Sequence, residues 1–128
     1  MVKVDTVTLH GGRAVPLAFD VAALIELEEK YGSMDGAMDA INAPQHSAQA
    51  RLDFVMIIAR CGEKHAPTGT PVEDAWLMQH TAPHELAALL REAIRNAGKN
   101  LTGHDAPEKK RTVDVTLEEL ERKNAPGS

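Results

Sequence analysis

The sequence predicts an α+β fold that is predominantly α-helical, with an N-terminal β-hairpin, about five helices and a flexible C-terminal tail. Three observations lead to this fold class. Period-two alternation is confined to the first 19 or so positions, apolar residues then recur at spacings of three and four, and large apolar residues become sparse after Gly98. We therefore expect a folded domain over residues 1–98 and a polar tail over residues 99–128.

The hairpin is predicted from two extended runs that flank a pair of glycines. Residues 3–10, "KVDTVTLH", alternate as a strand does, and residues 14–19, "AVPLAF", form the returning strand. Gly11 and Gly12 can adopt positive φ without steric cost, which favours a tight turn between the runs. Pro16 has no N–H to donate, so its strand is expected to lie at a sheet edge or to contain a bulge.

Two helices are expected next, each beginning at a polar capping residue. The Asp20 carboxylate can accept hydrogen bonds from free backbone amides, and Gly32 is suited to end the helix that follows. Ser33 is expected to cap a short second helix over residues 34–42, on which Met34 and Met38 share a face.

A third helix is predicted from Ser47 to about Gly62. Its segment "LDFVMIIARC", residues 52–61, is apolar over most of the helical circumference, which is typical of a helix surrounded by other elements. We expect the middle of the core here. Cys61 is the single cysteine, which excludes an intrachain disulfide and a Cys-rich zinc site and favours a buried structural thiol.

Two further helices complete the predicted domain. Residues 70–73, "TPVE", have the sequence of a capping box with Pro in the first turn, and they predict the start of the fourth helix. The last long helix is expected from about Pro83 to Ala97, with Gly98 as its end. One more short helix, from Thr116 to Lys123, could form within the tail.

Charge and hydropathy exclude several classes of partner. The formal net charge is -5, and the acidic excess lies in residues 1–98, which carry thirteen acidic and eight basic side chains. This balance argues against binding to nucleic acid or to an anionic membrane surface. No apolar run approaches the roughly 20 residues needed to cross a bilayer. We expect a soluble protein of a reducing cytoplasm.

Residues suited to chemistry are few and poorly arranged. His80 and His84 are four apart, as two metal ligands on one helix face would be, but Pro83 should break the helix between them. Asp35 and Asp39 also share a face, yet two carboxylates alone make a poor cation site. Because no nucleophile or phosphate-loop pattern accompanies them, we predict no catalytic residue, no cofactor and no metal site.

Apolar surface is the remaining candidate for function. Met34 and Met38 have flexible thioether side chains that adapt to varied apolar partners, although core filling is the alternative for both. Trp76 and Leu77 are adjacent and cannot both face the same core, so one of them should meet a neighbouring element or a second protein. We predict that these four residues border a partner-binding groove.

The N-terminal pattern also resembles a known family. Residues 7–32, "VTLHGGRAVPLAFDVAALIELEEKYG", include an "LxELEExxG"-like run over residues 24–32. This segment is similar to the opening of tail assembly chaperones from phages with long, non-contractile tails and from related prophages. The similarity continues through a short helix, an apolar helix and the Thr70–Pro71 helix start, to about residue 97.

The resemblance implies a function that needs no reactive group. Such chaperones bind the hydrophobic, helical tape-measure protein in the host bacterial cytoplasm, and they are not expected in the mature virion. A longer form, made by programmed frameshifting, recruits tail tube protein. Family members often self-associate, so a homo-oligomer is a further expectation. The alternatives are a generic interaction or adaptor module of a mobile element and, third, a small metal-binding enzyme using His80, His84 or Asp35.

Overall fold

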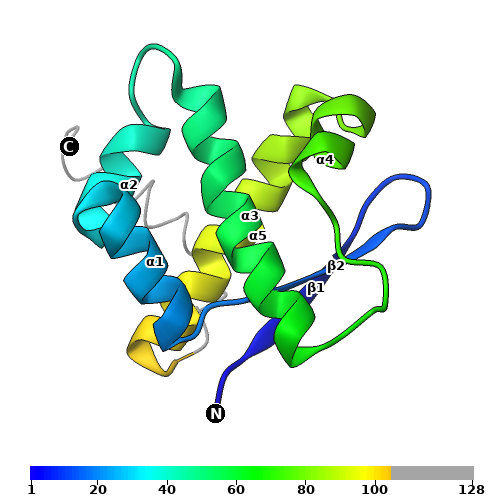
Figure 1. The fold of residues 1–128 in the computed structure, drawn as a ribbon, viewed down its shortest axis with the longest axis horizontal. Helices are drawn as coiled ribbons and strands as arrows, with labels where there is room; N and C mark the ends of the chain where they lie inside the picture. The colour runs from blue at the N-terminus through cyan, green and yellow to red at the C-terminus, as the bar shows by residue number, and fades with distance from the viewer. Residues whose placement is uncertain (105–128) are drawn as a thin grey trace, which may run out of the picture.

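The computed structural model describes residues 1–104, which form an antiparallel hairpin followed by five helices (Figure 1). This arrangement confirms the predicted fold class. Strand β1 pairs with β2 so that Val4 lies opposite Ala18 and Thr8 opposite Ala14. The elements are β1 (Val4–Thr8), β2 (Ala14–Ala18), α1 (Val21–Tyr31), α2 (Met34–Ile41), α3 (Ser47–His65), α4 (Asp74–His80) and α5 (Pro83–Thr102).

The turn of the hairpin depends on the two glycines, as predicted. Gly11 and Gly12 have φ values of +95° and +89°, in the region that side chains other than hydrogen disfavour. The Leu9 amide donates to the Arg13 carbonyl at 2.7 Å and closes the loop. The glycine pair therefore fixes the register of the strands on either side.

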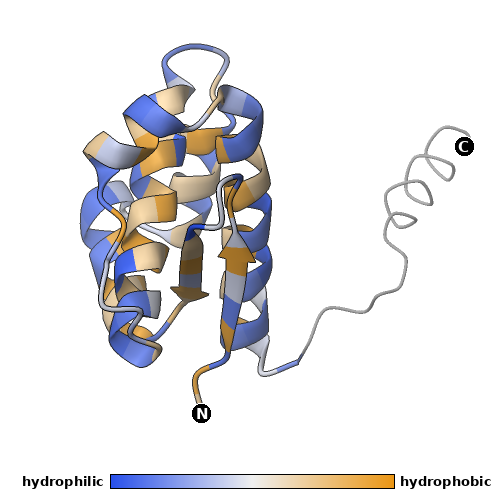
Figure 2. Ribbon diagram, turned by 90° about the vertical axis from the view of Figure 1, so that its right-hand side faces the viewer, coloured by the Kyte–Doolittle hydropathy of each residue, from blue (hydrophilic) through white to orange (hydrophobic). Residues whose placement is uncertain are grey.

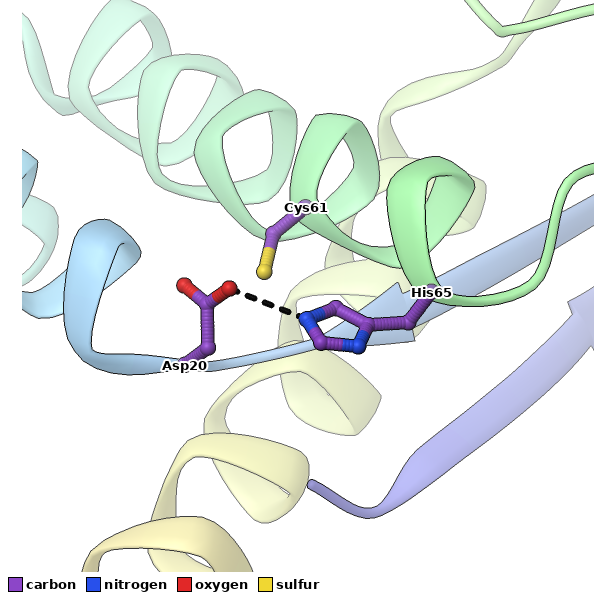
Figure 3. Close-up of side chains that lie close together, drawn as sticks. All are labelled: Asp20, Cys61 and His65. Carbon is purple, nitrogen blue, oxygen red and sulfur yellow. Dashed lines mark hydrogen bonds and ion pairs between the residues drawn. The ribbon is translucent and has the colours of Figure 1, made fainter. Parts of the chain in front are cut away.

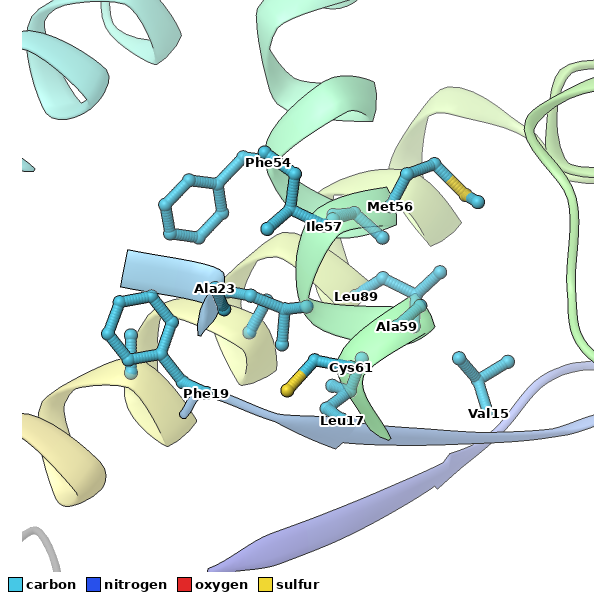
Figure 4. Packing of buried hydrophobic residues seen from close by; sticks show 14 of the residues in the cluster. Val15, Leu17, Phe19, Ala23, Phe54, Met56, Ile57, Ala59, Cys61 and Leu89 are labelled. Carbon is cyan, nitrogen blue, oxygen red and sulfur yellow. The ribbon is translucent and has the colours of Figure 1, made fainter. Parts of the chain in front are cut away.

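Helix α3 is the centre of the molecule and contacts every other helix and strand that the structure describes. In Figure 1 it runs between α1 and α2 on one side and α4 on the other, and α5 crosses behind it. Its buried side chains meet those of β2 and α5 in the core shown in Figure 4. The prediction from its nearly all-round apolar sequence is confirmed. The buried residues of α3 are Leu52, Phe54, Val55, Met56, Ile57, Ile58, Ala59, Cys61 and Gly62.

The free edge of β2 is covered by α3 at a glycine. A Cβ atom on Gly62 would lie 2.0 Å from the Pro16 carbonyl oxygen, so only glycine allows this approach of helix to strand. Because Pro16 has no N–H, the helix does not bury an unpaired backbone donor when it covers this residue. The predicted edge position of Pro16 is confirmed, and the helix covers the edge.

The opposite edge of the hairpin is held by amide side chains of α5. Asn100 accepts a hydrogen bond from the Lys3 amide at 2.8 Å and donates to the Lys3 carbonyl at 3.1 Å. Asn96, which is fully buried, donates to the same carbonyl and to the Asp5 carboxylate. Lys99 pairs with Asp5 at 2.8 Å. These contacts satisfy backbone groups that an exposed edge strand would leave open.

The predicted caps of the first two helices are present. Asp20 accepts a hydrogen bond from the Ala23 amide at 2.9 Å, and Gly32 ends α1 with φ of +85°. Ser33 accepts from the Gly36 amide at 2.9 Å and caps α2. Local side-chain chemistry therefore decides where both helices begin.

The fourth helix begins later than its sequence predicted. Thr70 does not cap it: α4 begins at Asp74, and Glu73 before it is extended. The Thr70 carbonyl instead accepts a hydrogen bond from Arg13 at 2.8 Å, and Val72 is buried against the core. These tertiary contacts hold residues 70–73 in a non-helical conformation despite their capping-box sequence.

Two predicted helix ends were wrong because helices continue through their glycines. Helix α5 passes Gly98 and ends at Thr102, with Gly103 as a left-handed cap. Residues 99–102, assigned to the tail from sequence, are thus helical. Similarly, α3 continues past Gly62 to His65. The suggested tail helix, Thr116 to Lys123, lies outside the described residues.

In Figure 2 the outer helices carry alternating bands of hydrophilic and hydrophobic residues, as expected of helices with one face on a core.

Candidate functional site

An apolar cleft lies where α3, α4 and α5 meet, and we call it the three-helix cleft. Its volume is about 330 Å³. Leu77 is almost completely buried at this cleft, whereas Met78 beside it is 60% exposed. A buried floor with an exposed apolar side chain next to it is suited to receiving an apolar partner. The lining residues are Ala48, Gln49, Leu52, Leu77, Met78, Thr81, Ala82, Pro83 and Leu86.

The shape of the cleft depends on the sharp connection between α4 and α5. Thr81 and Ala82 are extended, and Pro83 begins the next helix. The Thr81 hydroxyl donates to the Leu77 carbonyl, and the Ala82 amide donates to the Glu85 carboxylate at 2.8 Å. These polar groups of the connection form hydrogen bonds within the chain. The surface that the connection presents to the cleft is therefore mainly apolar.

A second apolar region lies where α1 begins and α5 ends, and we call it the N-terminal cleft. Its volume is about 270 Å³. Val21 is 70% exposed and Leu101 48% exposed at this cleft, and Ile25 follows Val21 by one helical turn with 49% exposure. The predicted amphipathic helix α1 thus carries aliphatic side chains on its outer face as well as its inner one. The lining residues are Met1, Val2, Phe19, Asp20, Val21, Leu24, Asn100 and Leu101.

The structure does not bring the four predicted partner-binding residues together in one groove. Leu77 lines the three-helix cleft. Met34 and Met38 lie on α2, half-buried against the core, on the other side of α3 from α4 (Figure 1). This placement favours the core-filling alternative for the two methionines. Their spacing indicated a shared face correctly, but it contained no information on what covers that face.

Trp76 is half-buried and packed by polar neighbours. The Arg13 guanidinium lies 4.8 Å from the centre of the indole ring, a cation–π contact. The His80 ring stacks on the indole with centroids 4.8 Å apart. The alternative that one member of the Trp76–Leu77 pair meets a neighbouring element is confirmed, since Trp76 meets the hairpin loop while Leu77 faces the core.

Three side chains with ligand chemistry meet between the start of α1 and the end of α3 (Figure 3). The ligand atoms of Asp20, Cys61 and His65 all lie within 4.8 Å of one another. His65 Nε2 is 2.9 Å from Asp20 Oδ2. The carboxylate can only accept, so Nε2 carries the proton. The remaining Asp20 oxygen caps α1 through the Ala23 amide.

The electrostatics of this cluster favour a charged carboxylate and a neutral thiol. The hydrogen bond from His65, helped by those from the Ala23 amide and the Cys61 thiol, lowers the pKa of Asp20 to about 2, against the opposing effect of partial burial. Burial raises the pKa of Cys61 to about 11. A protonated thiol is a weak nucleophile, so the raised pKa of Cys61 does not favour cysteine-based catalysis at neutral pH.

Sequence reasoning missed this cluster for an identifiable reason. Asp20 was interpreted only as a helix cap and Cys61 only as a buried thiol, and both interpretations are confirmed. His65 lies beyond Gly62, near which the sequence predicted the end of this helix. The available signal was the four-residue spacing of Cys61 and His65, which puts both on one helix face once α3 extends to His65.

The histidines considered from sequence are separated as expected. His80 is the last residue of α4 and His84 the second of α5, with a non-helical connection between them. Asp35 is exposed in the first turn of α2.

No helix within residues 1–104 has the length and apolar content needed to cross a membrane. Comparisons with protein-family models, curated proteins and solved structures found no match to this chain.

Proposed function

We propose that this chain is a phage tail assembly chaperone that binds the tape-measure protein and helps to recruit tail tube subunits. The observation that carries the proposal is the three-helix cleft, where largely apolar side chains surround a volume of about 330 Å³. An amphipathic helix binds by placing its apolar face into a groove of this kind. The sequence resemblance over residues 6–97 supplies the identity of the partner.

The exposed apolar side chains of the folded domain and the net charge of the chain support a binding role. Val21, Ile25 and Met78 are large apolar side chains that remain about half exposed or more. The net charge of -5 keeps a protein with such surfaces from aggregating. A contact of modest area is weak enough to be displaced when tube subunits arrive. The chaperone would act in the host cytoplasm before the tail is complete.

Co-expression with a tape-measure fragment tests the proposal directly. The partner is encoded by the very long gene that should follow this one, and the expected result is a soluble complex isolated by affinity and size-exclusion chromatography. Met78→Lys and Ala48→Glu place charges at exposed positions of the three-helix cleft. Each should weaken binding by about tenfold or more, because a charge must be desolvated on complex formation.

Ile25→Lys is the matched control, since it charges an exposed aliphatic residue on α1, away from the three-helix cleft. It should leave tape-measure binding within about twofold, provided that this cleft is the binding surface. Circular dichroism would verify that all variants remain folded. Equal binding by the wild type, Met78→Lys and Ala48→Glu would remove the assignment of the cleft. Absence of any complex would remove the proposed function, leaving the adaptor of a mobile element as the second candidate.

A further inference from the structure

We propose that Asp20, Cys61 and His65 form a binding site for one divalent cation of the zinc class. The three side chains come from two distant segments, the start of α1 and the last turns of α3, and they converge on one point (Figure 3). The proposal is independent of the tape-measure interaction, because it concerns a different set of residues from those of the three-helix cleft.

The distances in the cluster are close to those of a metal centre. Zinc–ligand bonds of 2.0–2.3 Å in a tetrahedral site place neighbouring ligand atoms about 3.3–3.8 Å apart. The three ligand atoms here all lie within 4.8 Å of one another, and Asp20 Oδ2 and His65 Nε2 are 2.9 Å apart. Conversion to a coordinating arrangement needs ligand-atom movements of about 1 Å, transfer of the His65 proton from Nε2 to Nδ1, and release of the Cys61 thiol proton to solvent.

The backbone already orients the ligands. Cys61 and His65 are one helical turn apart on α3, so both side chains leave the same face. The Ala23 amide holds Asp20 Oδ1 at 2.9 Å and leaves Oδ2 directed at the cluster. A ligating carboxylate whose second oxygen is fixed by a hydrogen bond is typical of metal sites.

The helix ends have opposing effects on a cation. The carbonyls at the C-terminus of α3 favour positive charge, whereas the amides at the N-terminus of α1 oppose it. These two contributions are similar in size, so the ligand atoms determine whether the cation binds. Metal binding displaces the Cys61 thiol proton, and the Asp20 carboxylate and the resulting thiolate together supply two negative charges, which outweigh the partial charge of one helix terminus.

The donor set indicates the class of metal. One carboxylate oxygen, one sulfur and one imidazole nitrogen suit zinc or a similar transition metal, whereas magnesium and calcium prefer oxygen ligands. The side chains of His65 and Asp20 are 33% and 23% exposed, which gives a cation a path from solvent. Three protein ligands leave a fourth position for water. Binding would tie the first turn of α1 to the end of α3.

Cobalt substitution tests the site through the thiolate. The full reduced chain, stripped of metal with a chelator, is titrated with Co²⁺. We expect one equivalent to bind with a near-ultraviolet thiolate-to-cobalt charge-transfer band, and Zn²⁺ to displace it. Zn²⁺ should also raise the melting temperature, since it binds the folded state. Cys61→Ser should abolish the band, and His65→Ala should weaken binding by about tenfold or more.

Two further variants keep the test decisive. Asp20→Asn retains a good helix cap while removing the charged ligand, so it should fold normally and bind cobalt at least about tenfold more weakly. His80→Ala removes a histidine outside the cluster and should bind as the wild type does. If no thiolate band appears, or if zinc stabilises Cys61→Ser and His65→Ala as much as the wild type, the cluster is only a hydrogen-bonded helix cap and the proposal is wrong.

Discussion

Gly62 and Asn96 show how single residues decide the packing of this fold. Gly62 lets α3 lie directly against the backbone of β2, because its missing side chain leaves room for the Pro16 carbonyl. Asn96 is polar and fully buried, yet its amide donates to the Lys3 carbonyl and to Asp5. A buried polar group is tolerated when its hydrogen bonds are made, and here they anchor α5 to the hairpin.

Alanine at two glycines of the helices should have opposite effects. Gly62→Ala would put a methyl group 2.0 Å from the Pro16 carbonyl oxygen, so the strand or the helix must move. We expect the free energy of unfolding to fall by about 1–3 kcal/mol or more. Gly98→Ala, in an open position of α5, should raise it by about 0.5–1 kcal/mol through helix propensity. Urea denaturation followed by circular dichroism measures both, and a neutral Gly62→Ala would contradict the close approach.

Asp5 should make part of the stability depend on pH. Burial by itself would raise the pKa of Asp5, but hydrogen bonds from Lys99 and Asn96 and nearby positive charges hold that pKa below its ordinary value. A carboxylate with a lowered folded-state pKa contributes stability that is present above about pH 4 and lost as the pH falls through the folded-state value. Asp5→Asn should therefore cost about 1 kcal/mol at pH 7 and much less near pH 2.

The measurement for Asp5 is the free energy of unfolding of wild type and Asp5→Asn across that pH range. The comparison isolates one carboxylate, because the other titrating groups are common to both proteins and cancel in the difference. A difference between the two proteins that stays constant from pH 7 to pH 2 would show that the contacts of Asp5 with Lys99 and Asn96 do not depend on its charge.

At the level of elements, the sequence predicted what local chemistry controls and failed where distant contacts intervene. The glycine turn and the caps by Asp20 and Ser33 involve neighbours in sequence, and all were predicted. The start of α4 and the end of α5 were not. Arg13, 57 residues away, binds the Thr70 carbonyl, and Asn100 binds Lys3, 97 residues away. Such partners cannot be read from a local pattern.

The last turn of α5 should be part of the folded unit. A chain ending after Gly98 loses the Lys99–Asp5 ion pair and the Asn100 hydrogen bonds to Lys3. We expect it to be less stable than the full chain by about 2–4 kcal/mol. A chain ending after His104 keeps the Lys99–Asp5 ion pair and the Asn100 hydrogen bonds to Lys3, and it is the matched control. Thermal and urea unfolding compare the two, and equal stability would support the predicted domain boundary at residue 98.

At the scale of the whole molecule, the candidate sites were harder to predict than the fold because each site combines residues that are distant in the sequence. The three-helix cleft combines side chains from residues 48 to 86, and the Asp20 cluster joins positions 45 residues apart. Hydrophobic periodicity identified the helices that carry these residues but gave no information on which helices are neighbours. Of the four predicted partner-binding residues, only Leu77 lines that cleft.

The proposed binding mode predicts a distinct thermodynamic signature. Burial of apolar surface in the three-helix cleft should give a negative heat-capacity change on binding a tape-measure fragment. Because Met78 and Leu77 contribute no charge, the dissociation constant should change by less than about threefold between roughly 50 and 500 mM salt. Isothermal titration calorimetry at several temperatures and salt concentrations measures both quantities. Affinity that falls by an order of magnitude with salt would point instead to the acidic surface as the contact, and the cleft would then not be where the partner binds.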